Sequence, residues 1–141
     1  MSNKSEGSAF ERRLAQILSA YGYWVHLMAQ NVNGQPFDLL AAKNRRVYPI
    51  DCKVCSNYVF QFSRVEENQR LSMEKWKHDY GLTGWFALQF LHGEIAFLSY
   101  DMIVHRSKSR KSISWEEVVM NGLSFSEWVA FNEMAHHEDH Y

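Results

Sequence analysis

The sequence predicts an α/β fold in which α-helices flank a mixed central β-sheet, and three observations support this fold class. Apolar residues recur at helical spacing in two long segments. Several short apolar segments bounded by turn residues have the length and composition of strands. Their order along the chain, which is helix, three strands, helix and two strands, is typical of a mixed sheet with helices packed against it.

Both helical segments carry terminal signals as well as apolar spacing. The first helix is expected over residues 8–21, with Ser8 as its N-cap. The second is expected over residues 63–80 and opens with Ser63-x-x-Glu66, the pattern of a capping box. A glycine follows each segment and favours the end of the helix there.

The strands are expected to form a meander before the second helix and a hairpin after it. Asn44-Arg45-Arg46 separates two apolar runs and predicts a turn, and His92-Gly93 predicts another. Capping-box patterns at Ser114-x-x-Glu117 and Ser124-x-x-Glu127 predict short C-terminal helices. The expected strands are Tyr23–Ala29, Phe37–Lys43, Val47–Val54, Gly84–Leu91 and Glu94–Tyr100, with a turn-rich segment over residues 30–36.

Length and composition restrict the class of protein. A chain of 141 residues is expected to form one domain with a single core. Its 46% hydrophobic and 22% charged residues exclude a disordered chain. The sequence lacks both a membrane-length apolar run and the apolar stretch of a signal peptide, so a cytoplasmic location is expected. The net charge of −1 argues against indiscriminate binding of polyanions.

Two carboxylates and one amine are expected to converge at neighbouring strand ends. Side chains alternate along a strand, so Asp51 and Lys53 point to one face of the sheet while Cys52 points to the other. Asp38 comes from the preceding strand, which the predicted turn folds back beside them. Asp38, Asp51 and Lys53, called here the acid-acid-lysine set, would form the site of a magnesium-dependent nuclease.

The chemistry of these side chains fits a metal site. Mg²⁺ prefers carboxylate oxygens and keeps several waters, so Asp38, Asp51 and the backbone carbonyl of Cys52 are candidate ligands. The ammonium of Lys53 would orient the attacking water and stabilise charge on the transition state. Two structural alternatives stay open. Asp38 could form a salt bridge with a neighbouring cation, Arg45, Arg46 or Lys53, and Lys53 could merely keep the two acids apart.

The acid-acid-lysine set, with Pro36-Phe37 before its first acid, resembles the PD-(D/E)xK nuclease signature. Residues 7–11 open a helix upstream, and residues 62–69 follow the strand of Lys53. Together these features resemble the RecU-type and archaeal Holliday junction resolvases, over about residues 7–100. Asp51 stands where these resolvases more often carry Glu, and the chain has little room for the projecting stalk of the cellular RecU enzymes.

The resemblance implies a restriction-endonuclease-like core in one nuclease domain over residues 1–141. The core would cover about residues 7–100 and a C-terminal helical extension about residues 101–135. The implied activity is that of a structure-selective DNA endonuclease, a homodimeric Holliday junction resolvase that uses Mg²⁺, for which Mn²⁺ can substitute. Its DNA partner would be branched, and the cut would leave 5′-phosphate and 3′-hydroxyl ends.

The resemblance also adds two residues to the catalytic set. Glu11 would contribute to the metal site, through water, whereas Ser8-x-x-Glu11 alone would make it part of a capping box. Gln69 would lie near the catalytic Lys53, whereas its plain interpretation is a solvent-facing glutamine.

Two other functions remain in competition with the resolvase. One is a PD-(D/E)xK nuclease with another DNA substrate, such as a phage, restriction or repair enzyme. The other is a DNA- or protein-binding module that keeps the fold without catalysis. A broken acid-acid-lysine set would favour the second, and here the set is intact.

Basic and aromatic residues supply the remaining candidates. The basic segment 105–111 is expected to be a flexible loop that contacts phosphates, although a solvated charge run is its usual explanation. The tryptophans are expected in the core, residues 58–62 in the core or a dimer interface, and residues 125–131 in a dimer interface. Cys52 and Cys55 are interpreted as reduced thiols, the rival being a redox or zinc site. The candidate DNA-binding residues are Arg12, Arg13, Lys43, Arg45, Arg46, Arg106, Lys108, Arg110 and Lys111.

Overall fold

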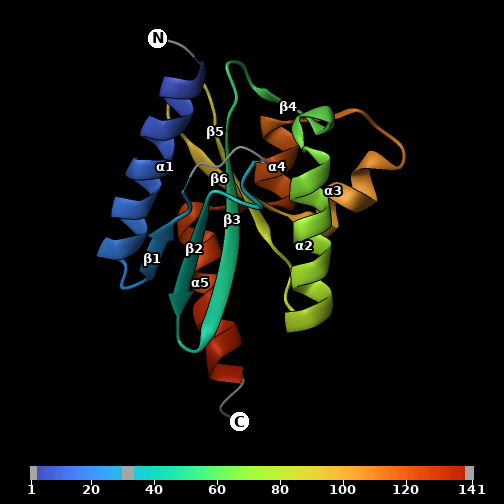
Figure 1. Ribbon diagram of the computed structural model, residues 1–141. Helices are drawn as coiled ribbons and strands as arrows, with labels where there is room; N and C mark the ends of the chain where they lie inside the picture. Colours follow the sequence, from blue (N-terminus) through green and yellow to red (C-terminus); the bar gives the residue numbers. More distant parts are fainter. Residues whose placement is uncertain (1–2, 30–33, 139–141) are drawn as a thin grey trace.

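The computed structural model describes residues 3–29 and 34–138 as a mixed sheet with helices on both faces (Figure 1). The expected turn segment 30–36 therefore lies partly outside the described residues. The main sheet has the strand order β1-β2-β3-β5-β6-β8, and β4 pairs with β7 in a small separate sheet. The strands are β1 Trp24–Leu27, β2 Leu39–Lys43, β3 Arg46–Val54, β4 Val59–Gln61, β5 Trp85–Gln89, β6 Ile95–Ser99, β7 Ser112–Ser114 and β8 Leu123–Ser124. The helices are α1 Asn3–Ala20, α2 Glu67–Tyr80, α3 Tyr100–Ser107, α4 Trp115–Asn121 and α5 Phe125–Glu138, with a 3₁₀ turn at Phe62–Arg64.

Strand pairing confirms the predicted meander, crossover and hairpin. β1, β2 and β3 pair antiparallel in succession, and β5 and β6 form the antiparallel hairpin. β3 and β5 run parallel, which requires the α2 crossover between them. The parallel pair lies in the middle of the sheet, so β3 has its central residues buried.

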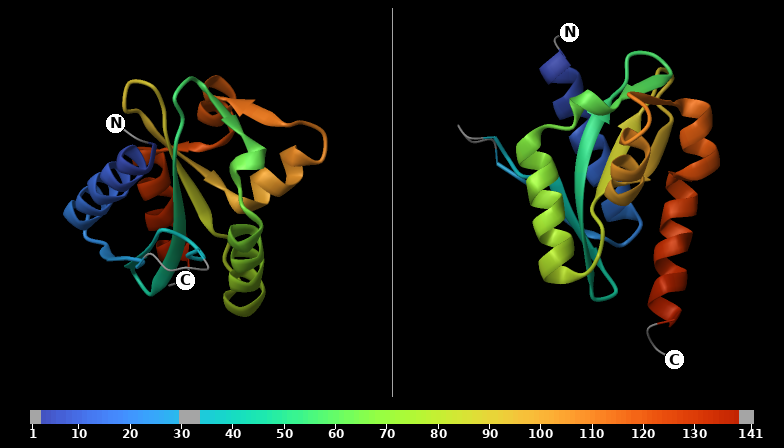
Figure 2. Two further views of the ribbon diagram at one scale, coloured as in Figure 1. Left: turned by 45° about the horizontal axis from the view of Figure 1, so that its top comes forward. Right: turned by 90° about the vertical axis from the view of Figure 1, so that its right-hand side faces the viewer.

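Helices cover both faces of the sheet (Figure 2), and the sheet separates the core into two clusters. On one face α1 contributes Phe10, Leu14 and Leu18, which pack with Trp128 of α5. On the other face α2 packs with α3, α4 and the small β4–β7 sheet, and Met73 of α2 is fully buried there. The buried residues of α1 lie four positions apart, which is the helical spacing of an apolar stripe.

The turn between β2 and β3 fixes the register of the meander. Asn44 and Arg45 both have left-handed backbone angles, with φ of 55° and 66°. Two consecutive residues of this kind match the right-handed twist of a hairpin, and asparagine tolerates the conformation well. Lys43 therefore pairs with Arg46, and Leu39 pairs with Ile50.

Two helix starts differ from the sequence prediction. The first helix begins at Asn3, so Ser8 is not its N-cap and lies inside it. The second begins at Glu67 with Glu66 as N-cap, and Ser63 belongs to the preceding 3₁₀ turn. The backbone NH of Phe62 donates to the carbonyl of Lys111 at 2.9 Å, which ties this turn to the β7 side and delays the helix. The capping boxes at Ser114 and Ser124 are confirmed, since each serine accepts a hydrogen bond from the backbone three residues later.

Two expectations about side-chain exposure and one about secondary structure differ from the structure. Trp24 is 61% exposed, because β1 is an edge strand and its ring stacks on His26 instead of entering the core. Phe60 and Phe62 are buried, since β4 pairs with β7 over the second core cluster, and cannot form an exposed interface. Residues 105–107 of the basic run 105–111 are helical rather than loop, because α3, which Ser99 caps by accepting a hydrogen bond from Met102 N at 3.1 Å, continues to Ser107.

None of the helices in the described ranges, 3–29 and 34–138, has the length and apolarity required to cross a membrane.

Candidate active site

The acid-acid-lysine set meets at the point where β2 begins and β3 nears its end. Asp38 directly precedes β2, and its backbone NH donates to the carbonyl of Ile50 at 3.1 Å. Asp51 and Lys53 lie in β3 and share one face of it. Asp38 is 7% exposed and Asp51 is fully buried, so both carboxylates are withdrawn from solvent. Burial of charged groups without compensation is costly, which makes this cluster unusual for a sheet interior.

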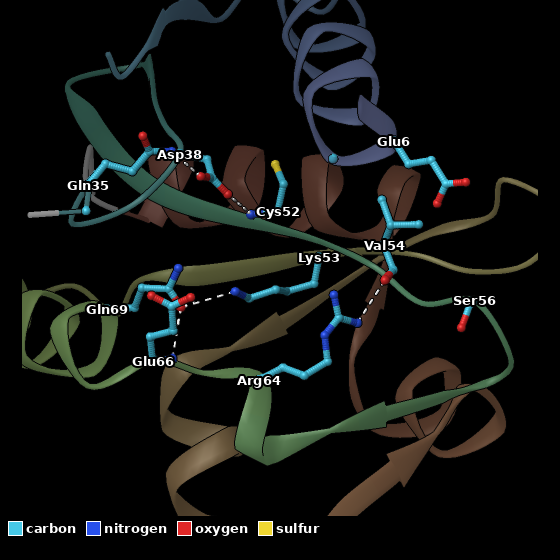
Figure 3. A pocket seen from close by; sticks show the side chains of 12 residues that line it. Glu6, Gln35, Asp38, Cys52, Lys53, Val54, Ser56, Arg64, Glu66 and Gln69 are labelled. Carbon is cyan, nitrogen blue, oxygen red and sulfur yellow. Dashed lines mark hydrogen bonds between the residues drawn. The ribbon is translucent and has the colours of Figure 1, made fainter. Parts of the chain in front are cut away.

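Lys53 of β3 and Gln69 of α2 lie on the side of the site that faces α2 (Figure 3). The Lys53 ammonium lies 3.2 Å from Oδ2 of Asp51, and the Lys53 side chain is only 12% exposed. Lys53 Nζ also donates to Oε1 of Gln69 at 3.2 Å, while Gln69 Nε2 donates to Oδ1 of Asp51 at 3.1 Å. Gln69 Oε1 further accepts from the backbone NH of Glu66 at 3.1 Å. Gln69 is thus buried between both catalytic candidates and is not a solvent-facing glutamine.

Asp38 is oriented by two donors. The backbone NH of Cys52 donates to its Oδ2 at 2.7 Å, and Nε2 of Gln35 donates to its Oδ1 at 2.5 Å. Asn68 of α2 in turn donates to the carbonyl of Gln35 at 3.1 Å. The carboxylate of Asp38 therefore has a fixed orientation without an arginine or lysine bound to it. The proposed salt bridge of Asp38 to Arg45, Arg46 or Lys53 is not among the ion pairs of the described residues.

Glu11 reaches the same cluster from α1. Burial and the neighbouring Asp38 carboxylate raise the pKa of Glu11 to about 7, and the two carboxyl groups share a hydrogen bond. Burial, followed by the charge of Asp38, also raises the pKa of Asp51 well above its usual range, although Lys53 opposes the shift. Because Glu11 lies in the helix interior and faces Asp38, the alternative role in a capping box is wrong.

A cavity of about 600 Å³ opens beside these residues. Figure 3 shows that its walls come from the end of β3, the loop before β2, the start of α2 and the N-terminal part of α1. Asp38, Lys53 and Gln69 line it, and so do the arginine of the 3₁₀ turn, Arg64, and the acidic Glu66. The cavity leaves room beside the carboxylates for a phosphate group and water.

The donors present fit a hard divalent cation. Oδ2 of Asp51 is buried, and its neighbour among the described residues is the Lys53 ammonium at 3.2 Å, with which it forms an ion pair. In the parts of the chain that the structure describes, no three Asp, Glu, His or Cys side chains converge as a complete ligand set. Magnesium binds through one or two carboxylates and retains waters, so Asp38 and Asp51 would suffice as protein ligands, and their role as ligands stays a prediction. The roles of the Cys52 carbonyl and of Glu11 as further ligands stay predictions.

We expect Gln69→Leu to lower the cleavage rate by about 10-fold to 100-fold, because groups that orient metal-site residues have effects of this size. The substitution removes the acceptor of Lys53 and the donor to Asp51. Initial rates on a DNA substrate measure the effect. The matched control is Gln16→Leu, an exposed position on α1, which should retain the rate. Equal cleavage rates for both variants and the parent would show that Gln69 has no role in the reaction.

The two cysteines are free and buried in different core clusters, Cys52 with Phe10 and Leu14 of α1 and Cys55 with Phe60 and Phe62. Burial raises the pKa of both thiols, which keeps them protonated. Their placement matches the interpretation as reduced thiols and gives no support to a shared redox or zinc site.

The basic candidates for DNA binding are spread over the molecule. Lys43 forms an ion pair with Glu133 at 2.8 Å, Arg110 pairs with Glu117, and Arg13 donates to Gln89 at 2.6 Å. Arg45 and Arg46 lie at the far end of the β2–β3 hairpin, roughly 23 Å along β3 from Lys53 at the usual rise per residue. Arg12 is exposed beside Glu11, and the other basic candidates, Arg106, Lys108 and Lys111, lie on or after α3.

Sequence reasoning missed several residues of the cavity, among them Gln35, Arg64 and Glu66. Gln35 stands directly before Pro36-Phe37 of the motif, and the other two lie in the segment 62–69 that carries part of the family resemblance. The available signal was their proximity to the motif. Their side-chain directions depend on the 3₁₀ turn and on the late start of α2.

Comparisons with known proteins agree with this geometry. A search of the curated proteins found no match. Among solved structures, Archaeoglobus fulgidus Hjc, described as a Holliday junction resolvase from an archaeal hyperthermophile, has a TM-score of 0.67 and 20% sequence identity. The similarity covers 89% of this chain and 96% of that one, and confirms the restriction-endonuclease-like fold. A model of the archaeal Holliday junction resolvase family (Hjc) matches residues 2–136. Since the match spans nearly the whole sequence, the chain belongs to the archaeal Holliday junction resolvase family.

Proposed function

We propose that the protein is a magnesium-dependent Holliday junction resolvase whose active site is the cluster of Asp38, Asp51 and Lys53. Its family membership makes it a structure-selective junction endonuclease that requires a divalent metal. The observation that supports the site most strongly is the row of carboxyl groups from the half-buried Glu11 to the buried Asp38 and Asp51, with Lys53 at its end. Burial, followed by the neighbouring charge of Asp38, raises the pKa of Glu11 and of Asp51, and a bound metal ion would offset both effects.

Each residue then has a defined task in phosphodiester hydrolysis. Asp38 and Asp51 would hold the metal, with Gln35 fixing the orientation of Asp38. The bound metal supplies an activated water and neutralises charge on the phosphoryl oxygen. Lys53, positioned by Gln69, would orient this water and stabilise the charge that develops on the phosphate. The water oxygen bonds to phosphorus as the bond to the 3′ oxygen breaks, leaving 3′-hydroxyl and 5′-phosphate ends.

We further propose that the enzyme works on DNA in the cytoplasm and as a homodimer. A four-way junction presents two symmetry-related phosphates, and a twofold dimer presents two sites in matching orientation. Phe131 and Met134 on α5 are 50% and 62% exposed and belong to the 125–131 candidate interface and its continuation. Trp128, between them, is fully buried and belongs to the core instead.

The direct test compares DNA substrates of different shape with the same purified protein and Mg²⁺. We expect paired, symmetric cuts in a four-way junction and at least ~10-fold slower cleavage of linear duplex, flap and single-stranded DNA. Sedimentation velocity at micromolar concentration should give the mass of a dimer. A monomer that cuts duplex as fast as junction would leave a nuclease of another substrate as the better function.

The identity of the metal has its own test. Mg²⁺ and Mn²⁺ should support cleavage, whereas Ca²⁺ should support junction binding without turnover, because its larger and looser shell positions the attacking water poorly. Excess chelator should abolish cleavage, and added Mg²⁺ should restore it. Cleavage that continues in chelator would contradict a metal mechanism. Gel-shift affinity in Ca²⁺ provides the matched measurement of binding.

A further inference from the structure

Arg64 shares the active-site cavity but has no place in the mechanism described above. It lies in the 3₁₀ turn Phe62–Arg64, between the small sheet and α2, and it lines the same 600 Å³ cavity as Asp38 and Lys53. In Figure 3 Arg64 and Lys53 extend on the same side of β3. The cavity therefore has a second cationic side chain beside the one assigned to the reaction.

The guanidinium of Arg64 is anchored at one corner. Nη1 donates to the carbonyl of Val54 at 2.8 Å and lies 3.9 Å from Sγ of Cys55. The guanidinium carbon lies 6.0 Å from the ring centroid of Phe60, within range of a cation–π contact. These contacts hold the group at the end of β3, in the wall of the cavity, and use only one of its nitrogen atoms as a donor.

Among the side chains that the structure describes, no acid is bound to Arg64. Within residues 6–29 and 34–135, whose side chains the structure describes, its contacts are those to Val54, Cys55 and Phe60. Arg70, by contrast, lies 3.9 Å from Glu67, and Arg110 pairs with Glu117. A guanidinium held in an open cavity without an anion presents a planar fork that matches the oxygens of a phosphate.

The position of Arg64 along β3 indicates which phosphate of the DNA it would bind. Lys53 and the carboxylates surround the place of the scissile phosphate, while Arg64 is attached one residue further along the strand, at Val54. We propose that Arg64 binds the phosphate next to the scissile one on the cut strand and so positions that strand in the site. This inference rests on the proposed nuclease function and adds a phosphate subsite to it.

The proposal predicts an energetic coupling between Arg64 and one phosphate charge. Junctions with a single neutral methylphosphonate would be compared, placed on either side of the scissile phosphate or far from it. Affinity would be measured in Ca²⁺, where the DNA is bound but not cut. We expect the parent protein to lose about 10-fold in affinity for one flanking substitution, the size of a charge-assisted hydrogen bond. Arg64→Gln should bind the unmodified junction about 10-fold more weakly and lose nothing further with that methylphosphonate.

Control variants separate this role from a structural one. Arg70→Gln removes the same charge from α2 outside the cavity and should keep the full methylphosphonate effect of the parent. Arg64→Lys retains the positive charge and should keep part of the methylphosphonate effect. If Arg64→Gln shows the same methylphosphonate losses as the parent at both flanking positions, Arg64 only caps the Val54 carbonyl and the proposal is overturned. Coupling to the distant position alone would overturn it as well. Failure of the parent to cut junctions would instead count against the proposed function.

Discussion

Asp51→Asn is expected to lower the cleavage rate by at least about 10³-fold while leaving the thermal midpoint unchanged or higher. A metal that activates water and neutralises phosphate charge contributes several kcal/mol to the reaction, and an amide is a much poorer ligand than a carboxylate. The same substitution should not lower the stability of the fold. Folding raises the pKa of Asp51, chiefly through burial, so its ionised form is less stable in the fold than in the unfolded chain. Removing this charge at neutral pH therefore removes a destabilising contribution.

Single-turnover cleavage and a thermal melt in metal-free buffer measure the two effects. Asp101→Asn is the matched control, because Asp101 lies on α3 in an exposed ion pair with Lys77 at 2.7 Å. It should cut at the parent rate. A lower thermal midpoint for Asp51→Asn at pH 7 would contradict the inference that burial destabilises the Asp51 charge. An unchanged cleavage rate would exclude Asp51 from the reaction.

Lys53→Met should abolish cleavage and, in contrast, destabilise the metal-free protein. It removes the cation that lies 3.2 Å from a fully buried carboxylate, and breaking a buried pair from one side costs about 3 kcal/mol. This loss of folding stability should depend on pH. The pKa of Asp51 is already raised in the fold and rises further without Lys53, so the penalty is small near pH 4 and grows as the pH rises through the folded-state pKa.

Chemical denaturation at several pH values measures this penalty. Lys77→Met, which removes an exposed partner of Asp101, should change stability by less than about 1 kcal/mol at every pH. In the Asp51→Asn background Lys53→Met should lose most of its cost, because no buried charge is left unpaired. A constant penalty across pH and background would mean that Lys53 stabilises the protein through packing rather than charge.

The core of the site could be predicted because it depends on local rules. Strand alternation alone puts Asp51 and Lys53 on one face, and a two-residue turn brings Asp38 beside them. The sheet order followed from the meander, the crossover and the hairpin, each of which has a recognisable sequence pattern. Glu11 and Gln69 came from the family resemblance, and the structure places both against the carboxylates.

The remaining features depend on contacts between distant segments. Ser8 and Ser63 have the local pattern of helix caps, but the helices begin elsewhere because Asn3–Gly7 continues α1 and the 3₁₀ turn is tied to Lys111. The exposure of Trp24 follows from the edge position of β1, which sequence composition does not reveal. The basic residues gave a charge pattern, whereas their ion pairs with Glu117 and Glu133 required the folded chain.

The left-handed pair Asn44–Arg45 has a consequence for how insertions and deletions are tolerated. The turn lies at the opposite end of β3 from the catalytic residues, on the surface, where a change of length would ordinarily be harmless. Here a shift of one residue between β2 and β3 would turn every β3 side chain to the other face. Cys52 would then face α2 in place of Asp51 and Lys53, and the two carboxylates would no longer meet. A short surface turn thus determines whether the protein has an active site, and a change of its length would produce a folded sheet without one.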